Sequence, residues 1–283
     1  MKKLLRTFLF VFITTLPYYS TSIAQTQNGV IITDKAEYIA TYRYEYQEDS
    51  TNIESRKQKE MCLLIGKSSS QFVHNSIFKM DSLFFYCPDI NNPESGLKIG
   101  KQIVKNSYSY HTQYRIVKTK NSRQSDLYEV MSGKYYHLPE EITFNWQLVN
   151  QPDTFITYYI CKEAQTTFRG RHYRAWYTLS IPISDGPYKF KGLPGMIVRI
   201  EDIEKEHCFT LTSFEKINYD KSMYIWDKKF IKIDAKQYLA LKHNETLESI
   251  NKYGNNQFVN LTPEKRGSVQ AKIASRNNLL EKQ

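Results

Sequence analysis

Alternating aromatic residues in short runs are the feature that most constrains this fold. Residues 37–46 place Tyr38, Tyr42, Tyr44 and Tyr46 on one side of an extended chain. Successive side chains of a strand point to opposite faces, so this alternation is typical of a half-buried strand. The whole chain has 22 Tyr, 15 Phe and 3 Trp, or 14% aromatic residues. Because aromatic residues favour strands, the composition predicts a mainly β protein.

The remaining predicted strands are short and separated by turn residues. They are expected at 61–66, 71–74, around Tyr108 to Tyr114, at 126–136 as strand–turn–strand about Ser132-Gly133, and at 155–161, 171–181, 196–201 and 208–214. Pro and Gly residues predict a loop over residues 88–100. Strands at this spacing, without helical repeats between them, indicate antiparallel neighbours instead of βαβ units.

Helix signals are concentrated near the C-terminus. Asp234 is a candidate N-cap of a helix that runs through Lys242. Thr262 followed by Pro263 is a second start signal, for a polar helix towards Leu280. We therefore expect an α+β chain that is mainly β, with a curved antiparallel sheet, a half-barrel as one form of it, and C-terminal helices.

The first residues have the pattern of an export signal. Lys2, Lys3 and Arg6 precede the apolar run 8–13, and Ser22-Ile23-Ala24 suits cleavage after Ala24. That run is too short for a bilayer, which needs about 20 residues, and no later run is long enough. An ordinary N-terminal strand is the alternative. We expect a cleaved signal peptide over 1–24, no lipid-anchor Cys and no transmembrane segment. One β-rich domain over 25–283 would then be periplasmic or secreted.

Removal of the signal peptide changes the charge. The full chain has 39 basic and 29 acidic residues and a net charge of +10. Residues 1–24 contain three basic and no acidic residues, so the remainder carries 36 − 29 = +7. Export makes nucleic acid an unsuitable partner despite this charge.

Four cysteines follow the predicted cleavage site. An oxidising compartment permits two disulfides, for which three connectivities exist. We favour pairs between neighbours, Cys62 with Cys87 and Cys161 with Cys208, and buried free thiols are the alternative. The Cys and His spacings match no zinc motif, so neither a metal nor a cofactor is expected.

A pair of turns lies between two predicted strands in the middle of the chain. Leu193-Pro194-Gly195-Met196 suits a type II turn, in which Pro194 fixes φ and Gly195 takes a positive φ. Gly192, Leu193, Pro194 and Gly195 thus form a structural motif, which needs no catalytic explanation.

This segment resembles the GLPGLI family of exported proteins of Gram-negative bacteria, which is uncharacterised. The naming hexapeptide is present as Gly192–Ile197, with Met196 in the place of the usual Leu. The resemblance extends to Trp146, to residues 161–164 and to the Gly170-Arg171 and Ala175–Tyr177 elements. It implies export and one β-rich domain, and it supplies neither a substrate nor catalytic residues.

Basic and aromatic residues alternate around these turns, which suggests contact with a ligand or partner. The candidates are Arg171, Tyr173, Trp176, Tyr188 and Phe190. A buried Arg that pairs with a carboxylate or stacks on Trp is the structural alternative.

Sequence motifs of enzymes are missing, since there is no GxSxG, HExxH, P-loop or GxGxxG. Asp185, Glu201, Asp202 and Glu204 are expected to be solvated. We therefore favour a non-enzymatic binding or accessory protein for an apolar or anionic small ligand, or for a cell-envelope protein. The alternative is a secreted hydrolase whose site is assembled from dispersed carboxylates or His residues.

Overall fold

The computed structural model of the chain describes residues 26–27, 29–79, 114–244, 262, 264, 267, 268, 271 and 278–282. Its strands are β1 (Thr26–Gln27), β2 (Val30–Asp49), β3 (Asn52–Gly66), β4 (Ser69–His74), β5 (Arg115–Thr119), β6 (Gln124–Met131), β7 (Lys134–Glu141), β8 (Gln147–Leu148), β9 (Thr154–Ile156), β10 (Tyr159–Phe168), β11 (Arg171–Thr178), β12 (Met196–Asp202), β13 (His207–Lys216), β14 (Ser222–Trp226) and β15 (Ile231–Lys232).

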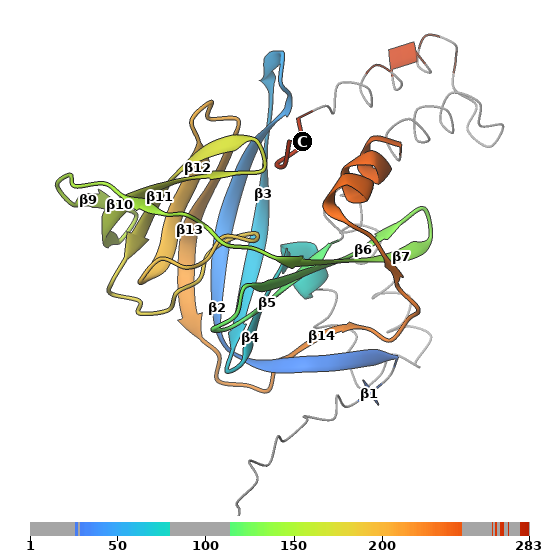
Figure 1. Cartoon of the computed structure of the whole chain (residues 1–283), viewed down its shortest axis with the longest axis horizontal. Coiled ribbons are helices and arrows are strands. Elements are labelled where there is room, and N and C mark those ends of the chain that lie inside the picture. Colours follow the sequence, from blue (N-terminus) through green and yellow to red (C-terminus); the bar gives the residue numbers. More distant parts are fainter. Residues whose placement is uncertain are drawn as a thin grey trace, which may run out of the picture.

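These strands form one sheet that does not close into a barrel, in the order β15-β7-β6-β5-β4-β3-β2-β13-β12-β11-β10-β8. Strands β1 and β14 pair with β2, and β9 pairs with β10. Figure 1 shows β9 to β13 on one side and β4 to β7 on the other, joined by the long strands β2 and β3. Every pairing is antiparallel except that of β15 with β7. The prediction of a mainly β fold with an open sheet is confirmed.

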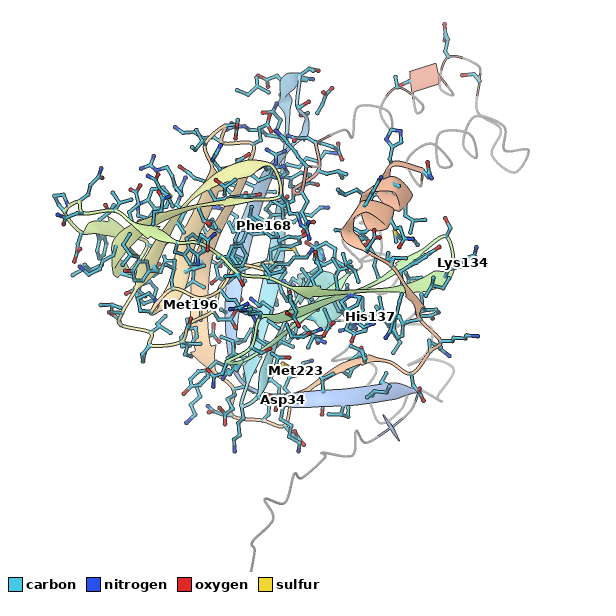
Figure 2. The ribbon with its side chains drawn as sticks, in the orientation of Figure 1. Asp34, Lys134, His137, Phe168, Met196 and Met223 are labelled. Atoms are coloured by element: carbon cyan, nitrogen blue, oxygen red, sulfur yellow. The ribbon has the colours of Figure 1, made fainter. Side chains whose placement is uncertain are left out.

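The aromatic alternation of β2 faces the core, as the sequence predicts. Tyr42 and Tyr44 are buried, and the Tyr44 ring stacks on Phe209 of β13 with 4.1 Å between ring centroids. The same core contains Phe168 of β10 and Met196 of β12, both labelled in Figure 2. The core therefore joins strands that are far apart in the sequence.

The first predicted C-terminal helix is present over residues 235–244. Asp234 caps it, because its Oδ1 accepts a hydrogen bond from the Gln237 backbone amide at 2.7 Å, and the Asp234 backbone amide donates to Gln237 Oε1 at 2.9 Å. Tyr238 and Lys242, one turn apart, both donate to the buried carboxylate of Glu129 on β6, at 2.9 and 2.5 Å. These bonds fix the helix to one side of the sheet (Figure 1).

Several predictions fall wholly or partly outside the described residues. These are the signal peptide, the loop 88–100, the strand around Tyr108 and most of the second helix, of which residues 264, 267, 268 and 271 are helical. Residues 155–161 are not one strand as predicted. They form a hairpin of β9 and β10, because Thr157 takes a positive φ of 53° in the turn between them. Among the described helices, none is long and apolar enough to cross a membrane.

The predicted Cys161–Cys208 disulfide is wrong, since both thiols are free and buried. Cys161 lies on β10 and Cys208 on β13, and strands β11 and β12 lie between them in the sheet. Three strand spacings amount to about 14 Å, whereas a disulfide needs Cα atoms within about 7 Å. Cys62 is also free and buried, and its predicted partner Cys87 lies outside the described residues.

Candidate functional site

The segment from residue 179 to 195 crosses between β11 and β12 and carries the turn motif. Gly195 does not take the positive φ that a type II turn requires, so that prediction is wrong. Glycine is needed there for a different reason. A Cβ atom on Gly195 would lie 2.0 Å from the carbonyl oxygen of Thr178, at the end of β11. The backbone of the turn thus packs directly on the backbone of the preceding strand.

The positive φ of the motif belongs to Gly192, at 98°. An added Cβ at Gly192 would face the indole of Trp146, whose Nε1 donates to the Lys191 carbonyl at 2.9 Å. Leu193 is buried, whereas Pro194 is exposed. The motif therefore anchors the segment by one apolar side chain and one indole hydrogen bond.

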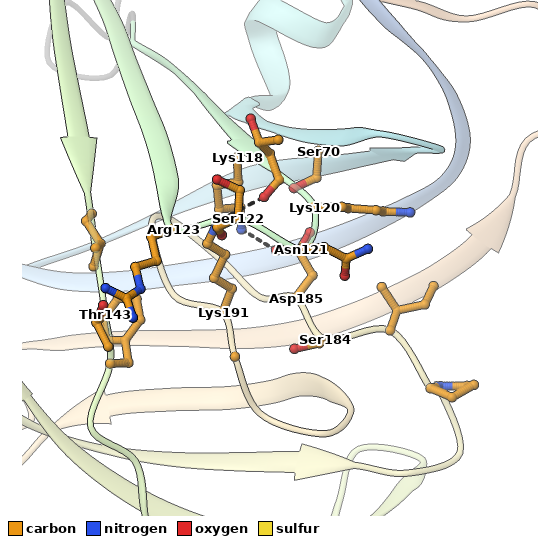
Figure 3. Close-up of a pocket in the computed structure, with 16 residues that line it drawn as sticks. Ser70, Lys118, Lys120, Asn121, Ser122, Arg123, Thr143, Ser184, Asp185 and Lys191 are labelled. Atoms are coloured by element: carbon orange, nitrogen blue, oxygen red, sulfur yellow. Dashed lines mark hydrogen bonds and ion pairs between the residues drawn. The ribbon is translucent and has the colours of Figure 1, made fainter. Parts of the chain in front are cut away.

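A cleft of about 660 Å³ lies beside this motif (Figure 3). It lies among the start of β4, the turn between β5 and β6, residues 142–144 and the segment 182–192. Its walls are formed by Ser70, Lys118, Thr119, Lys120, Asn121, Ser122, Arg123, Ile142, Thr143, Phe144, Pro182, Ile183, Ser184, Asp185, Lys191 and Gly192.

A row of polar residues crosses three neighbouring strands, and two of its members line the cleft. Ser70 on β4 is the register partner of Lys118 on β5, which is in turn the partner of Ser125 on β6. Register partners point to the same face of a sheet, about 5 Å apart. The hydroxyl oxygens of Ser70 and Ser125 are buried and make no hydrogen bond in the described part of the chain. Such a buried, unpaired hydroxyl costs free energy unless a further group reaches it.

Lys118 is buried and holds the segment 185–190 to the sheet. Its ammonium pairs with Asp185 and also donates to the carbonyls of Gly186 at 2.5 Å and Phe190 at 3.5 Å. Burial lowers the pKa of Lys118, and the Asp185 carboxylate acts in the opposite direction. With three acceptors around three N–H groups, this ammonium orders the turn and has no proton free for another contact.

Two further lysines line the cleft and bond to neutral oxygens. Lys191 donates to the carbonyls of Thr119, Ser122 and Gln124 at 3.1, 2.8 and 3.0 Å, which fixes the turn between β5 and β6. Lys120 donates to a backbone carbonyl of β3. Carbonyl partners leave the positive charges uncompensated. Burial and the nearby Lys118 ammonium accordingly lower the pKa of Lys191.

Arg123 completes the basic lining, and its guanidinium is exposed without a hydrogen bond or ion pair to any described residue. The lining thus contains four basic side chains and one acidic side chain, a balance of +3. Ile142, Phe144 and Ile183 give the same cleft an apolar wall. A concave site with this combination suits a small molecule that has both an anionic group and an apolar part.

The residues that the sequence analysis proposed for ligand contact do not line this cleft. Arg171, Tyr173, Tyr188 and Phe190 are buried, and the first three contact the C-terminal segment 278–282. Phe190 packs instead in an aromatic cluster, with its ring centroid 4.8 Å from that of Tyr173.

Trp176 is also buried, and two guanidinium groups lie over its ring. The Arg174 and Arg199 carbons are 4.9 and 5.8 Å from the ring centroid. The structural motif reaches the cleft only through Gly192.

The carboxylates expected in solvent are buried, with one exception. Asp185 pairs with Lys118, Asp202 pairs with Arg171, and Glu201 accepts from Arg199 at 2.6 Å. Glu204 is exposed, as expected. The expectation failed because pairing with a cation offsets the desolvation of a buried acid. The partners of Asp185 and Asp202 come from distant parts of the chain, whereas that of Glu201 is two residues away on β12.

Sequence reasoning missed Ser70, Lys118, Lys120 and Arg123. A signal for three of them exists in the basic turn Lys118-Thr119-Lys120-Asn121-Ser122-Arg123, which joins two strands. Nothing in the sequence marked Ser70 as a site residue, because residues 68–70 are three serines, which are typical of an ordinary turn.

Among the described residues, no group of three or more His, Cys, Asp or Glu side chains is placed to hold a metal ion. The chain is thus a mainly β protein with one open sheet and a cleft lined by basic side chains. Residues 101–199 match the family described as "Protein of unknown function (Porph_ging)", the GLPGLI-type family of Bacteroidetes proteins, which confirms the resemblance. That range contains every lining residue of the cleft except Ser70.

No curated protein matches the sequence. Two solved structures of PNGF-II, in space groups P21 and C2, are similar to the chain at 11% and 12% identity, each with a TM-score of 0.49. Each alignment covers 75% of this chain and 34% or 33% of the other, so the chain spans about a third of the length of PNGF-II.

Proposed function

We propose that this protein is an exported, non-enzymatic binding protein whose cleft takes a small amphiphile with an anionic group. In this proposal residues 1–24 are a cleaved signal peptide, and residues 25–283 act as one domain in the periplasm or outside the cell. The charge pattern of residues 2–6 and the small residues before position 25 support export.

The charge balance of the cleft carries the proposal. Four basic side chains and one carboxylate share a cleft of about 660 Å³. Asp185 compensates only one of these charges, and the carbonyl partners of Lys120 and Lys191 compensate none. In a low-dielectric concavity, like charges of this kind raise the local concentration of anions. An anion would relieve the mutual repulsion of Lys118 and Lys191.

The apolar wall and the buried hydroxyl restrict the ligand further. Ile142, Phe144 and Ile183 would cover an apolar tail, while the Ser70 hydroxyl could donate to the head group. An inorganic anion would leave the apolar wall in water. We therefore favour an amphiphilic ligand over a free ion.

The alternative of a secreted hydrolase has less support. Ser70 beside Lys118 has the residue types of a Ser-Lys catalytic pair. A lysine base must be neutral, however, and the Lys118 ammonium donates to three acceptors, one of them a carboxylate. The Ser70 hydroxyl also makes no hydrogen bond to Lys118, so the two side chains are not arranged as a nucleophile and its base.

Binding of octyl sulfate, measured by isothermal calorimetry below its micelle concentration, tests the proposal. We expect octyl sulfate to bind more tightly than octyl glucoside, which lacks the charge, and more tightly than sodium sulfate, which lacks the tail. Arg123→Gln should weaken octyl sulfate about tenfold, since a charge-assisted hydrogen bond contributes roughly 1.5 kcal/mol. Lys232→Gln, on exposed β15, is the matched control and should have no effect. Equal binding of octyl sulfate and octyl glucoside would contradict the proposal.

The affinity should also fall as the pH rises. Burial and Lys118 lower the pKa of Lys191 from its usual 10.5. A bound anion favours the ammonium form and so raises this pKa, which means that binding takes up protons. We expect the dissociation constant of octyl sulfate to stay constant below the pKa of Lys191 in the free protein, and to increase as the pH rises from that value towards the higher pKa in the complex. Lys191→Arg, which stays charged, should remove this dependence. A pH-independent constant in the unmodified protein would argue against a role for Lys191.

A further inference from the structure

The C-terminal segment Asn278–Lys282 lies against the end of the sheet formed by β11 and the turn before it. Its backbone also bonds to the end of β2, where the Asn278 amide donates to the Glu48 carbonyl, and the segment is drawn in dark red near the letter C in Figure 1. Its hydrogen bonds to Arg171, Tyr173 and Tyr188 each join residues more than 90 positions apart in the sequence. The segment is not a strand of the sheet. Side chains of the sheet bind its backbone and its side chains, as in the recognition of a peptide.

The backbone of the segment is held at four points, the first of which is the Asn278 backbone amide, a donor to the Glu48 carbonyl at 3.3 Å. Arg171 Nη2 donates to the Leu279 carbonyl at 2.9 Å, and the Tyr173 hydroxyl donates to the Leu280 carbonyl at 3.0 Å. The Lys282 amide donates to the Arg169 carbonyl at 2.9 Å. These contacts use only main-chain atoms of the segment. Leu279 is exposed, so its position accepts any side chain, whereas Leu280 packs against the hydrophobic core and its position favours an apolar one.

Two side chains of the segment are recognised specifically. The Asn278 amide accepts from Arg171 and donates to the Gln47 carbonyl at 3.0 Å. The Glu281 carboxylate accepts from the Tyr188 hydroxyl and from Lys189 Nζ, both at 2.6 Å. The site therefore selects Asn and Glu three positions apart, in the pattern Asn-x-x-Glu.

The site requires an anion at the Glu281 position. Lys189 is fully buried and pairs with both Glu140 and Glu281, and Arg169 pairs with the same two carboxylates. Without Glu281, two cations would share one carboxylate. A buried, uncompensated charge is costly, so a vacant site would favour any segment that brings a second carboxylate.

The chain's own segment does not satisfy the site completely. Glu281 Oε2 and Arg169 Nε face each other at 3.9 Å, and although both atoms are buried neither makes a hydrogen bond. Arg171 Nε is likewise buried without a hydrogen bond. A ligand whose carboxylate moved closer to Arg169 would gain a charge-assisted bond that the chain's own segment lacks.

We propose that this surface is a peptide-binding site for an extended Asn-x-x-Glu segment of a partner protein, and that residues 278–282 occupy it in cis. A segment with the same pattern displaces the chain's own residues. This site is separate from the cationic cleft, since neither Arg123 nor Lys191 contributes to it.

Fluorescence anisotropy with a labelled peptide of residues 277–283 tests the proposal on the full-length chain. In an Asn278→Ala, Glu281→Gln variant, whose own segment competes poorly, the peptide should bind at least tenfold more tightly than in the unmodified chain. A peptide with the same two changes should bind at least tenfold more weakly than the unchanged peptide. No binding to a variant that retains its circular dichroism spectrum would overturn the proposal. Arg123→Gln should leave peptide binding unchanged while weakening octyl sulfate, so the two proposals can fail independently.

Hydrogen exchange on the unmodified chain provides the second measurement, in case the double variant does not fold. The Lys282 amide, bonded to the Arg169 carbonyl, should exchange at least tenfold faster than core amides of β11 and β12, because displacement requires local opening. If the Lys282 amide exchanges only together with the core amides, the segment is a fixed part of the fold and the proposal is wrong.

Discussion

Gly195→Ala is expected to destabilise the protein by about 3 kcal/mol, because the added methyl group would overlap a backbone oxygen. The Cβ position lies 2.0 Å from the Thr178 carbonyl oxygen and 3.4 Å from that of Ile181. Neither oxygen belongs to a flexible side chain that can move aside. The turn would have to separate from the end of β11, and the Met196 amide would lose its 3.1 Å hydrogen bond to Ile181. In a chain of this size the thermal midpoint should fall by roughly 6–12 °C.

Gly133→Ala is the matched control for this change. Gly133 has a positive φ of 75° but nothing within 4 Å of its Cβ position, so only conformational strain is added. That strain costs about 1 kcal/mol. Thermal denaturation of both variants separates the two causes. A loss in Gly195→Ala no larger than that in Gly133→Ala would show that the turn moves aside at little cost and that close packing does not require glycine at position 195.

Arg171→Met is expected to cost about 3–5 kcal/mol, which is typical of removing one partner of a buried ion pair. The Arg171 guanidinium pairs with Asp202 at 2.5 Å and Glu206 at 2.7 Å, and its side chain is fully buried. The methionine would fill much of the space but leave the buried Asp202 carboxylate without its cation and Glu206 with only Lys282, at 3.9 Å. Urea denaturation measures the loss as a lower unfolding midpoint.

The loss in Arg171→Met should depend on pH. Burial raises the pKa of Asp202 above its usual 3.8, and Arg171 opposes this effect, so the variant should have a still higher pKa. A carboxyl group whose pKa is raised by folding binds protons more readily in the folded state. Its protonation therefore restores stability as the pH falls. We expect a smaller deficit at pH 5 than at pH 8.

Arg174→Met is the control for Arg171→Met. Arg174 is partly exposed and pairs with Glu163 at 3.1 Å, so its removal should cost about 1 kcal/mol or less. Similar losses in the two variants would mean that burial does not set the strength of the Arg171 interactions.

Local patterns in the sequence were sufficient for individual strands and for one helix. The tyrosine alternation of residues 37–46 predicts both β2 and its buried face, because the period of two is a property of the extended chain itself. Asp234 predicts the helix start equally well, because an N-cap bonds only to backbone amides a few residues further along the chain. The run 155–161 shows the limit, since Thr157 has no residue signature of a turn.

The candidate sites depended on long-range register, which local patterns do not contain. Ser70, Lys118 and Ser125 form one row only because three strands pair in a particular alignment. Asp185 and Asp202 were expected in solvent, and each is buried by a cation from another part of the chain. Cys161 and Cys208 are likewise far apart because two strands lie between theirs in the sheet, and this order cannot be read from their positions in the sequence.

The sequence alone was enough to predict the mainly β class and the family resemblance, and it raised the expectation of an export signal. Each of these depends only on residue type and spacing along the chain. The tertiary structure decided that Gly195 is required by contact and not by φ, that the basic residues divide between a cleft and a peptide site, and that Glu281 is buried. The physical reason is that charge compensation and close packing involve pairs of atoms brought together only by the folded sheet.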